Sequence, residues 1–142
     1  MAAHLAKVHE VTAWNRTPGR TIGGAAVVEA AEEVVENAEV ICLCVTGSED
    51  VHSLLDRLAP VARPGTLFID HSTIGPATAR EVAAVCAGQG LRFVDAPVTG
   101  GSVGAQNGSL TIFLGGEEAD VAEAIEVIRP YTKRAERVGP NG

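Results

Sequence analysis

The sequence predicts an α/β fold built on a doubly wound, mainly parallel sheet. Short apolar runs alternate with helix-like stretches along all 142 residues, and this alternation is typical of βαβ units. Apolar residues make up 46% of the chain and aromatic residues only 4%, so we expect a core of Val, Ala, Leu and Ile. That composition suits a buried sheet covered by alanine-rich helices. A chain of this length is expected to form one domain.

In the N-terminal half, the patterns predict a helix end at 1–7, a strand at 9–14, a helix at 25–38 and a strand at 39–45. The helix at 25–38 is based on the spacing of Val28, Ala31 and Val35, which places them on one face. The run EVICLCV at 39–45 is apolar throughout and too short for a helix, so we expect a central strand. A second helix is expected from Ser48, whose hydroxyl can cap it, to about Pro60.

The C-terminal half continues the alternation. Pro76 is placed where a first helical residue is expected, and Gly88 and Gly90 close that helix. The remaining predicted elements are a strand at 66–70, a strand at 91–97, a glycine-rich loop at 98–109, a strand at 110–116, a helix at about 117–128 and a strand at 135–139. Right-handed crossovers between the strands make the whole a doubly wound open sheet.

Charge and cysteine content exclude several classes of function. The net charge of −7, with no basic stripe, would repel a phosphate backbone, so we expect no nucleic-acid partner. No apolar run is long enough to span a membrane, and the cytoplasm is the default location. Cys42, Cys44 and Cys86 are interpreted as buried reduced thiols. No metal site is expected, because nothing completes a ligand set around the cysteines or around His4, His9 and His52.

In doubly wound sheets the ligand lies beyond the carboxyl ends of the strands. After the second strand of a dinucleotide fold, an acidic residue indicates a ribose diol, whereas a basic residue accommodates a 2′-phosphate. Here the strand ends in Asn15 and Arg16, which favours NADP over NAD. Taken alone, the same residues also fit an ordinary turn with a surface arginine.

The glycine loop of such a site should lie about 20 residues before Asn15, which is a position ahead of Met1. We therefore expect the first strand and the phosphate loop to be absent from this chain. The segment at 1–7 is interpreted as the end of the helix whose start would hold the pyrophosphate.

The segment DAPVTGGSVGAQNG is the most informative one. Gly100 and Gly101 expose consecutive backbone N–H groups, Thr99 adds a hydroxyl, and together they would fit a carboxylate. A flexible loop that needs glycine for positive φ is the alternative. His71 lies on another strand-end loop and has a rival interpretation as a catalytic residue, although an ordinary polar loop residue is favoured.

Four stretches, WNRTPGR, DHSTIGP, FVDAPVTGGSVGAQNGSLTIFLGG and VGPNG, resemble the β-hydroxyacid dehydrogenases. This group includes 3-hydroxyisobutyrate dehydrogenase, tartronate semialdehyde reductase and the NADP-binding domain of 6-phosphogluconate dehydrogenase. The resemblance spans essentially the whole chain. It implies a Rossmann-like domain that takes part in hydride transfer between a nicotinamide cofactor and a small β-hydroxy acid or its semialdehyde.

The resemblance also implies roles for individual residues. The adenosine 2′-phosphate side of NADP would be held by Asn15, Arg16 and Thr17. The nicotinamide ribose would lie against Val45, Thr46 and Thr73. The substrate carboxylate would be held by Thr99, Gly100 and Gly101, where most relatives have Ser in place of Thr99.

Two departures from the family are evident. Relatives continue past GPNG into a helix with the catalytic lysine and then into a helical domain with dimer contacts. Neither Lys7 nor Lys133 matches that motif, so no catalytic residue is expected in this chain. Val8 stands where relatives have the glycine of a helix-ending turn, so either the turn is remodelled or the helix runs on.

Two interpretations follow. In the first, residues 1–142 are a partial NADP-binding Rossmann domain, lacking the first strand and the C-terminal helical domain, of a 3-hydroxyisobutyrate dehydrogenase-like oxidoreductase that is inactive alone. In the second, the chain is a non-catalytic truncated domain that acts as an interaction module. Unpaired strand edges would favour association, so a homo-oligomer is possible in either case.

Overall fold

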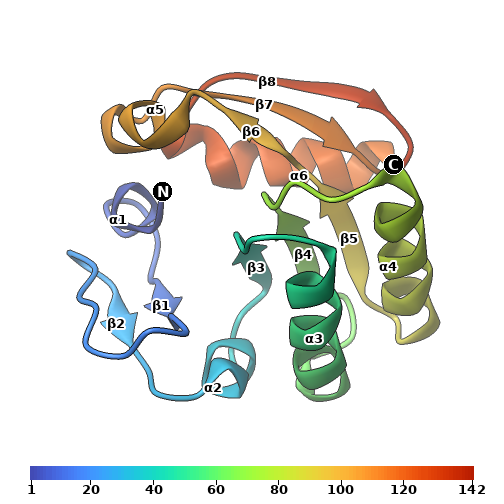
Figure 1. Ribbon diagram of the computed structural model, residues 1–142, viewed down its shortest axis with the longest axis horizontal. Coiled ribbons are helices and arrows are strands. Elements are labelled where there is room, and N and C mark those ends of the chain that lie inside the picture. Colours follow the sequence, from blue (N-terminus) through green and yellow to red (C-terminus); the bar gives the residue numbers. More distant parts are fainter.

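Helices cover both faces of a six-stranded sheet in the computed structural model, which describes residues 1–142 (Figure 1). The strands are β1 (Thr12–Ala13), β2 (Ala26–Val27), β3 (Val40–Leu43), β4 (Leu67–Asp70), β5 (Arg92–Asp95), β6 (Val98–Thr99), β7 (Leu110–Gly115) and β8 (Thr132–Gly139). The helices are α1 (Ala2–Leu5), α2 (Ala31–Val35), α3 (Ser48–Leu58), α4 (Pro76–Gly88), α5 (Gly101–Asn107) and α6 (Glu118–Ile128). Two short 3-10 helices follow α3 and α6, η1 (Ala59–Val61) and η2 (Arg129–Tyr131).

The large sheet has the order β3-β4-β5-β7-β6, and β8 also pairs with β7. Strands β3, β4 and β5 are parallel, as is the pair β7 and β8. Strand β7 runs antiparallel to β5 and β6. The mainly parallel, Rossmann-like α/β fold is thereby confirmed.

Alternate side chains of strand β4, which is paired on both sides, enter two separate cores. Phe68 packs with α2, α3 and α4 on one face of the sheet. Leu67 and Ile69 pack with α1 and α6 on the other face. Because helices cover both faces, the sheet is doubly wound, as the apolar runs of the sequence predict.

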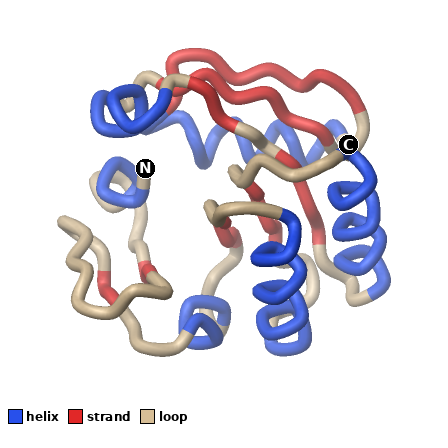
Figure 2. The backbone as a smooth tube through the Cα atoms, in the orientation of Figure 1, coloured by secondary structure: helices blue, strands red, loops and turns tan.

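Strands β1 and β2 form a separate two-stranded parallel sheet, which Figures 1 and 2 show set apart from β3. In a dinucleotide-binding sheet of order 3-2-1-4-5-6, the first strand lies between the second and the fourth. Strands β1 and β3 take the places of the second and fourth strands, and no residue of this chain pairs between them. The split sheet therefore matches the predicted lack of the first strand.

Several predicted elements are correct in place and packing. The helix predicted from Ser48 is α3, and its four apolar residues are all buried, namely Val51, Leu54, Leu55 and Leu58. Helix α4 begins at Pro76 and contains Gly88 as its last residue. The predicted last strand is confirmed and starts three residues earlier, at Thr132.

Three predicted elements are wrong in type or position. The segment at 25–38 is not one helix, because Ala26 and Val27 pair with β1 and only Ala31–Val35 is helical. Strand β3 lies at the edge of the large sheet rather than at its centre, since no strand pairs on its other side. The loop predicted at 98–109 contains β6 and the helix α5.

Three local details also differ from expectation. Ser48 is the first residue of α3 and makes no capping hydrogen bond; Gly47 is the cap. Cys42, on the edge strand β3, and Cys44, just after it, are exposed residues, although burial of their thiols raises the pKa of both; only Cys86 is a buried residue. At Val8 the turn is remodelled and the helix does not run on: the N–H groups of Val8 and His9 both donate to the Leu5 carbonyl at 2.9 Å, without positive φ.

Candidate functional site

A cavity of about 330 Å³ lies where β1 and β3 end against the first turns of α3. It is lined by five of the residues predicted to bind the cofactor, namely Asn15, Arg16, Thr17, Val45 and Thr46. These residues come from two strand ends that are about 30 positions apart in the sequence. The structure therefore brings together at one site the adenosine-side residues and the β3-end residues that the sequence indicates.

Local hydrogen bonds fix the β1 end of the cavity. The Asn15 Nδ2 group donates to the Thr17 carbonyl at 2.8 Å and closes a tight turn. The Trp14 indole N–H donates to the Glu29 carbonyl at 3.1 Å and ties this turn to the segment before α2. Trp14 is the only tryptophan of the chain, and it lines the cavity.

Three charged side chains line the cavity, Arg16, Asp50 and Arg57. The Arg16 Nη1 atom lies 3.1 Å from Asp50 Oδ1. Arg57 donates two hydrogen bonds to Glu32, at 2.8 and 3.0 Å, and its guanidinium lies 5.7 Å from the centre of the Trp14 ring. Arg57 is thus held by Glu32, while Asp50 is the partner of Arg16.

A hydrogen-bond relay joins the end of β4 to the cavity. The Ser72 hydroxyl accepts from the Val45 N–H at 2.9 Å, and the Ser72 N–H donates to Asp70 Oδ1 at 2.9 Å. Burial raises the pKa of Asp70, partly offset by the Ser72 hydrogen bond, and Asp70 Oδ2 has no partner. Thr73 follows Ser72 directly, is exposed and does not line the cavity.

His71 lies in the loop after β4, as the sequence favours, but it is buried rather than exposed. It is 3% exposed, with Nδ1 at 2.8 Å from the Ala96 carbonyl and Nε2 at 2.7 Å from the Tyr131 hydroxyl. Burial lowers the pKa of His71. Both ring nitrogens are engaged in the protein interior, so no substrate reaches them.

The residues predicted to bind the substrate lie outside this cavity, at the junction of β6 and α5. Thr99, Gly100 and Gly101 are exposed. Gly100 has φ +125° and a Cβ there would lie 3.2 Å from Leu110 Cδ2, so the position requires glycine. Gly101, with φ +60°, begins α5. The double glycine therefore serves a sharp strand-to-helix turn.

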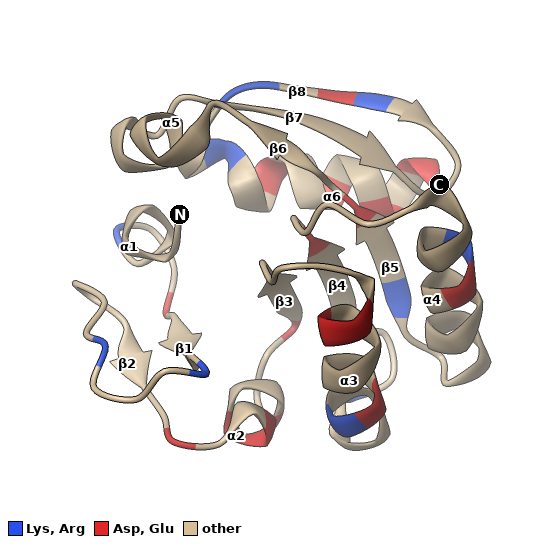
Figure 3. Cartoon of the chain, viewed as in Figure 1, with Lys and Arg blue, Asp and Glu red and all other residues tan.

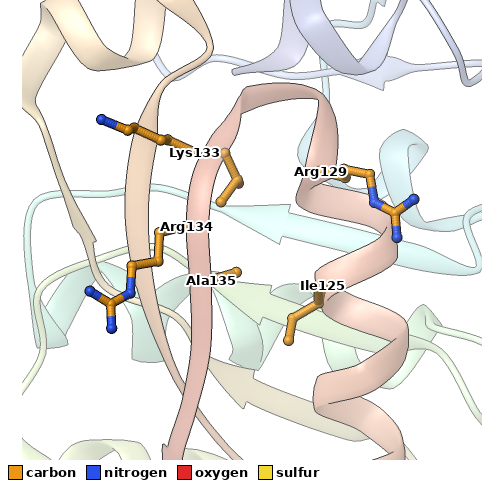
Figure 4. A pocket seen from close by; sticks show the side chains of 6 residues that line it. Ile125, Arg129, Lys133, Arg134 and Ala135 are labelled. Atoms are coloured by element: carbon orange, nitrogen blue, oxygen red, sulfur yellow. The ribbon is translucent and has the colours of Figure 1, made fainter.

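A second hollow, of about 160 Å³, lies between η2 and β8 and has three basic residues on its rim. Figure 4 shows Lys133 and Arg134 on the opposite side of the hollow from Arg129. Arg129 pairs with Glu126, and Arg134 pairs with Glu136 at 2.7 Å. The cations do not converge, so this hollow is not a candidate anion site. Across the whole molecule, basic residues are scattered over many elements (Figure 3).

The larger cavity has groups that could hold the adenosine half of a nicotinamide dinucleotide. It offers the Arg16 guanidinium for a phosphate and the indole of Trp14. Polar groups come from Asn15, Thr17 and Thr46. No Gly-x-Gly-x-x-Gly segment occurs in the chain, so these residues do not include the usual pyrophosphate cradle. No three His, Cys, Asp or Glu side chains gather as metal ligands, and no helix has the length and apolarity of a membrane span.

Sequence reasoning missed Trp14, Asp50 and Arg57 as cavity residues. Asp50 lies in the first turn of α3, where an acidic residue also favours the start of a helix. Its position directly after the β3 end was an available signal, because strand ends and the helix starts that follow them line such sites. Arg57 lies two turns further along α3 and gave no comparable signal.

Comparison with protein families matches residues 1–139 to the NAD-binding domain of 6-phosphogluconate dehydrogenase. An uncharacterized oxidoreductase of Synechocystis is 40% identical over the whole chain, which covers 52% of that relative. An NAD-dependent L-serine dehydrogenase of Pseudomonas aeruginosa is 37% identical over 87% of the chain and 43% of its own length. The chain thus spans about half the length of the relatives it matches.

Solved structures also match nearly the whole of this chain with about half of their own length. The 3-hydroxyisobutyrate dehydrogenase of Mycobacterium tuberculosis with L-serine superposes with a TM-score of 0.94, at 34% identity, over 99% of this chain and 50% of that one. Psf3 in complex with NADP+ and 2-OPP superposes with a TM-score of 0.89, at 26% identity, over 99% of this chain and 52% of that one.

Proposed function

This chain belongs to the family of the NAD-binding domain of 6-phosphogluconate dehydrogenase, and from that premise we propose that it is the NADP-binding part of a 3-hydroxyisobutyrate dehydrogenase-like oxidoreductase. The proposed reaction is hydride transfer between NADP(H) and a small β-hydroxy acid or its semialdehyde. The observation that carries the proposal is the cavity in which Arg16 lies together with Asn15, Thr17, Val45 and Thr46.

The adenosine end of the cofactor is assigned to the β1 end of the cavity. Arg16 supplies a planar cation for the 2′-phosphate, with Asn15 and Thr17 beside it. A neutral Asn15 avoids the repulsion that an acidic residue at this strand end would cause. The P. aeruginosa relative is named for NAD and the Psf3 complex contains NADP+, so the choice of NADP is based on Arg16 itself.

The nicotinamide end is assigned to the ends of β3 and β4. A bound nicotinamide accepts or supplies the hydride. Val45 and Thr46 line the cavity, and Ser72 fixes the Val45 backbone and so sets the position of this wall. Thr73 is exposed next to Ser72 and completes the proposed contact with the ribose.

The substrate carboxylate is assigned to Thr99, Gly100 and Gly101. The two glycines turn their backbone at the end of β6, where exposed N–H groups and the Thr99 hydroxyl can bind an anion. We expect the general acid to come from outside residues 1–142, because neither Lys7 nor Lys133 matches the family motif. A positioned proton donor contributes about 10² to 10⁴ in rate, so residues 1–142 alone are expected to be inactive.

Fluorescence titration of Trp14 with NADPH and NADH tests the cofactor assignment. We expect binding weaker than micromolar, because the pyrophosphate cradle is lacking, with NADPH ahead of NADH. Replacing Arg16 by Gln should remove that preference, while Arg20→Gln, a nearby charge change outside the cavity, should not. Equal binding of NADPH and NADH by the unmodified chain contradicts the NADP assignment.

The substrate assignment needs the longer protein that carries this domain. A panel of small β-hydroxy acids should be oxidised with NADP+, and replacing Thr99 by Val should raise KM more than it lowers kcat. No turnover of any member of the panel contradicts the proposed reaction.

An interaction module is the second candidate function. It is favoured by the β1 and β3 edges, which have no strand partner on their facing sides. Sedimentation of the chain distinguishes the two: a stable, concentration-independent complex with its own copies or another protein supports the module, whereas a monomer that binds NADPH does not.

A further inference from the structure

We propose that Asp50 sets how strongly the adenosine site prefers a phosphorylated ribose over a plain one. On this view Asp50 competes with a 2′-phosphate for Arg16, and it accepts a hydrogen bond from the 2′-hydroxyl when no phosphate is present. The inference rests on the proposed function and names the residue that determines its cofactor specificity.

The geometry begins with a single contact between two exposed groups. Arg16 Nη1 donates to Asp50 Oδ1 at 3.1 Å, and the two side chains are 76% and 35% exposed. Only one oxygen of the carboxylate takes part, so Oδ2 stays free to accept another donor. The contact joins the β1 turn to the first turn of α3, 34 residues later, and it forms at the rim of the cavity.

The other charges around the cavity do not compete for either partner. Arg57 is the third charged residue of the lining, and both its hydrogen bonds go to Glu32. Arg57 is further fixed by its position over the Trp14 ring. Arg16 is therefore the cation available to a phosphate, and Asp50 is the acid that neutralises it beforehand.

This arrangement has opposite effects on the two kinds of ribose. A 2′-phosphate brings negative charge toward Arg16 and meets the carboxylate of Asp50 nearby, so part of the Arg16 attraction is cancelled. A 2′-hydroxyl is a donor, and a carboxylate is the acceptor that dinucleotide folds use for it. In this chain the strand-end residue is the neutral Asn15, and Asp50 brings a carboxylate to the same cavity from the neighbouring helix.

Adenosine 2′-monophosphate and adenosine are suitable probes, because they need only the adenosine end of the site. Their dissociation constants are measured at pH 7.5 by calorimetry and by Trp14 fluorescence, for the unmodified chain and for Asp50→Asn. We expect the preference for the phosphorylated probe to rise by about three- to tenfold, because the substitution removes one partly screened negative charge near the phosphate. Most of the change should be tighter binding of the phosphorylated probe, with weaker binding of adenosine adding to it.

Glu49→Gln is the matched control. It removes the same charge from the same first turn of α3, but Glu49 does not line the cavity and forms no ion pair. Both substitutions weaken the favourable interaction of an acid with the helix start, so any effect through helix stability is common to them. We expect Glu49→Gln to leave the preference unchanged and Arg16→Gln to abolish it.

Three results overturn the inference. They are an unchanged or lower preference in Asp50→Asn, an equal rise in Glu49→Gln, and failure of adenosine 2′-monophosphate to bind either the unmodified chain or Asp50→Asn. The proposed function fails in a different measurement, namely when the unmodified chain does not distinguish NADPH from NADH.

Discussion

His71 and Tyr131 are joined by a 2.7 Å hydrogen bond between Nε2 and the phenol oxygen, although 60 residues separate them. The Ala96 carbonyl can only accept, so His71 Nδ1 carries the proton and Nε2 accepts from the Tyr131 hydroxyl. The two rings meet edge to face at 5.6 Å. One buried histidine therefore links the ends of β4 and β5 to η2.

Replacing Tyr131 by Phe keeps the ring and removes only the hydroxyl. Buried Nε2 of His71 would lose its donor, so we expect the free energy of unfolding to fall by about 1–3 kcal/mol. Urea unfolding measures this difference. Thr132→Val is the comparison, because it removes a neighbouring hydroxyl whose 2.7 Å hydrogen bond to the Ile128 carbonyl is only partly buried. A loss for Tyr131→Phe no larger than for Thr132→Val would contradict a buried link.

Stability should fall as the pH drops below the ordinary histidine pKa of 6.5. Burial lowers the pKa of His71 in the folded chain, which outweighs the opposing effect of the Ala96 hydrogen bond. The unfolded chain then takes up the proton first, so acid favours unfolding, by at most about 1.4 kcal/mol per pH unit for one group. Burial raises the pKa of Asp70, so its contribution has the opposite sign: the folded chain takes up that proton first, and acid favours folding.

Urea unfolding from pH 7.5 to 5.5 separates the two contributions when the unmodified chain is compared with His71→Asn. The variant is expected to be less stable at pH 7.5 and to show a smaller loss of stability toward pH 5.5. If the stability of the two proteins fell in parallel with pH, the pKa of His71 would be the same in the folded and the unfolded chain.

The sequence was sufficient wherever local pattern and burial agree. Strand β4 and helix α3 have apolar spacings that match the core that they enter, and Pro76 can only begin a helix. The strand-end rule also placed Arg16 and Val45 together, because it depends on sheet topology and not on side-chain detail.

Expectations failed where a distant partner decides the outcome. Ala26 and Val27 continue the helical spacing of 25–38, yet pairing with β1 makes them a strand. Cys42 lies in an apolar run of the sequence, yet it is exposed, because no strand pairs with the free edge of β3. The His71–Tyr131 contact joins segments that carry no mutual signal, so it could not be predicted from one sequence. The strand-end rule could bring Asp50 to the same cavity as Arg16, but it could not predict the ion pair between them.

Ser72 should control the shape of the cavity without controlling its charge. In Ser72→Ala the Val45 N–H loses its acceptor, and the wall formed by Val45 and Thr46 loosens. We expect weaker binding of adenosine 2′-monophosphate and adenosine by the same factor, since Arg16 and Asp50 are untouched. Ser102→Ala, an exposed change on α5 outside the cavity, is the control. A change in the ratio of the two affinities would show that Ser72 acts on the charged pair instead.

Gly115 and Gly139 face each other in register on β7 and β8, but only one of them leaves no room for a side chain. A Cβ at Gly115 would lie 2.6 Å from Asp95 Oδ2 and 2.8 Å from the Pro140 carbonyl, whereas nothing lies within 4 Å of a Cβ at Gly139. We expect Gly115→Ala to lower the free energy of unfolding by about 1–3 kcal/mol through overpacking. Gly139→Ala should be neutral or stabilise by up to about 1 kcal/mol, because it restricts the unfolded chain.

The Gly115 contacts also hold the C-terminal segment. Asn141 Nδ2 lies 2.9 Å from Asp95 Oδ1 and 3.0 Å from the Gly115 carbonyl, so displacing Asp95 should release this side chain as well. Amide hydrogen exchange is therefore expected to accelerate at Gly142, whose N–H donates to Asp95 Oδ1 at 3.2 Å, in Gly115→Ala but not in Gly139→Ala. Equal unfolding energies for the two variants, or unchanged exchange at Gly142, would mean that Asp95 moves aside without cost and that the close approach of β7 to β5 tolerates a methyl group.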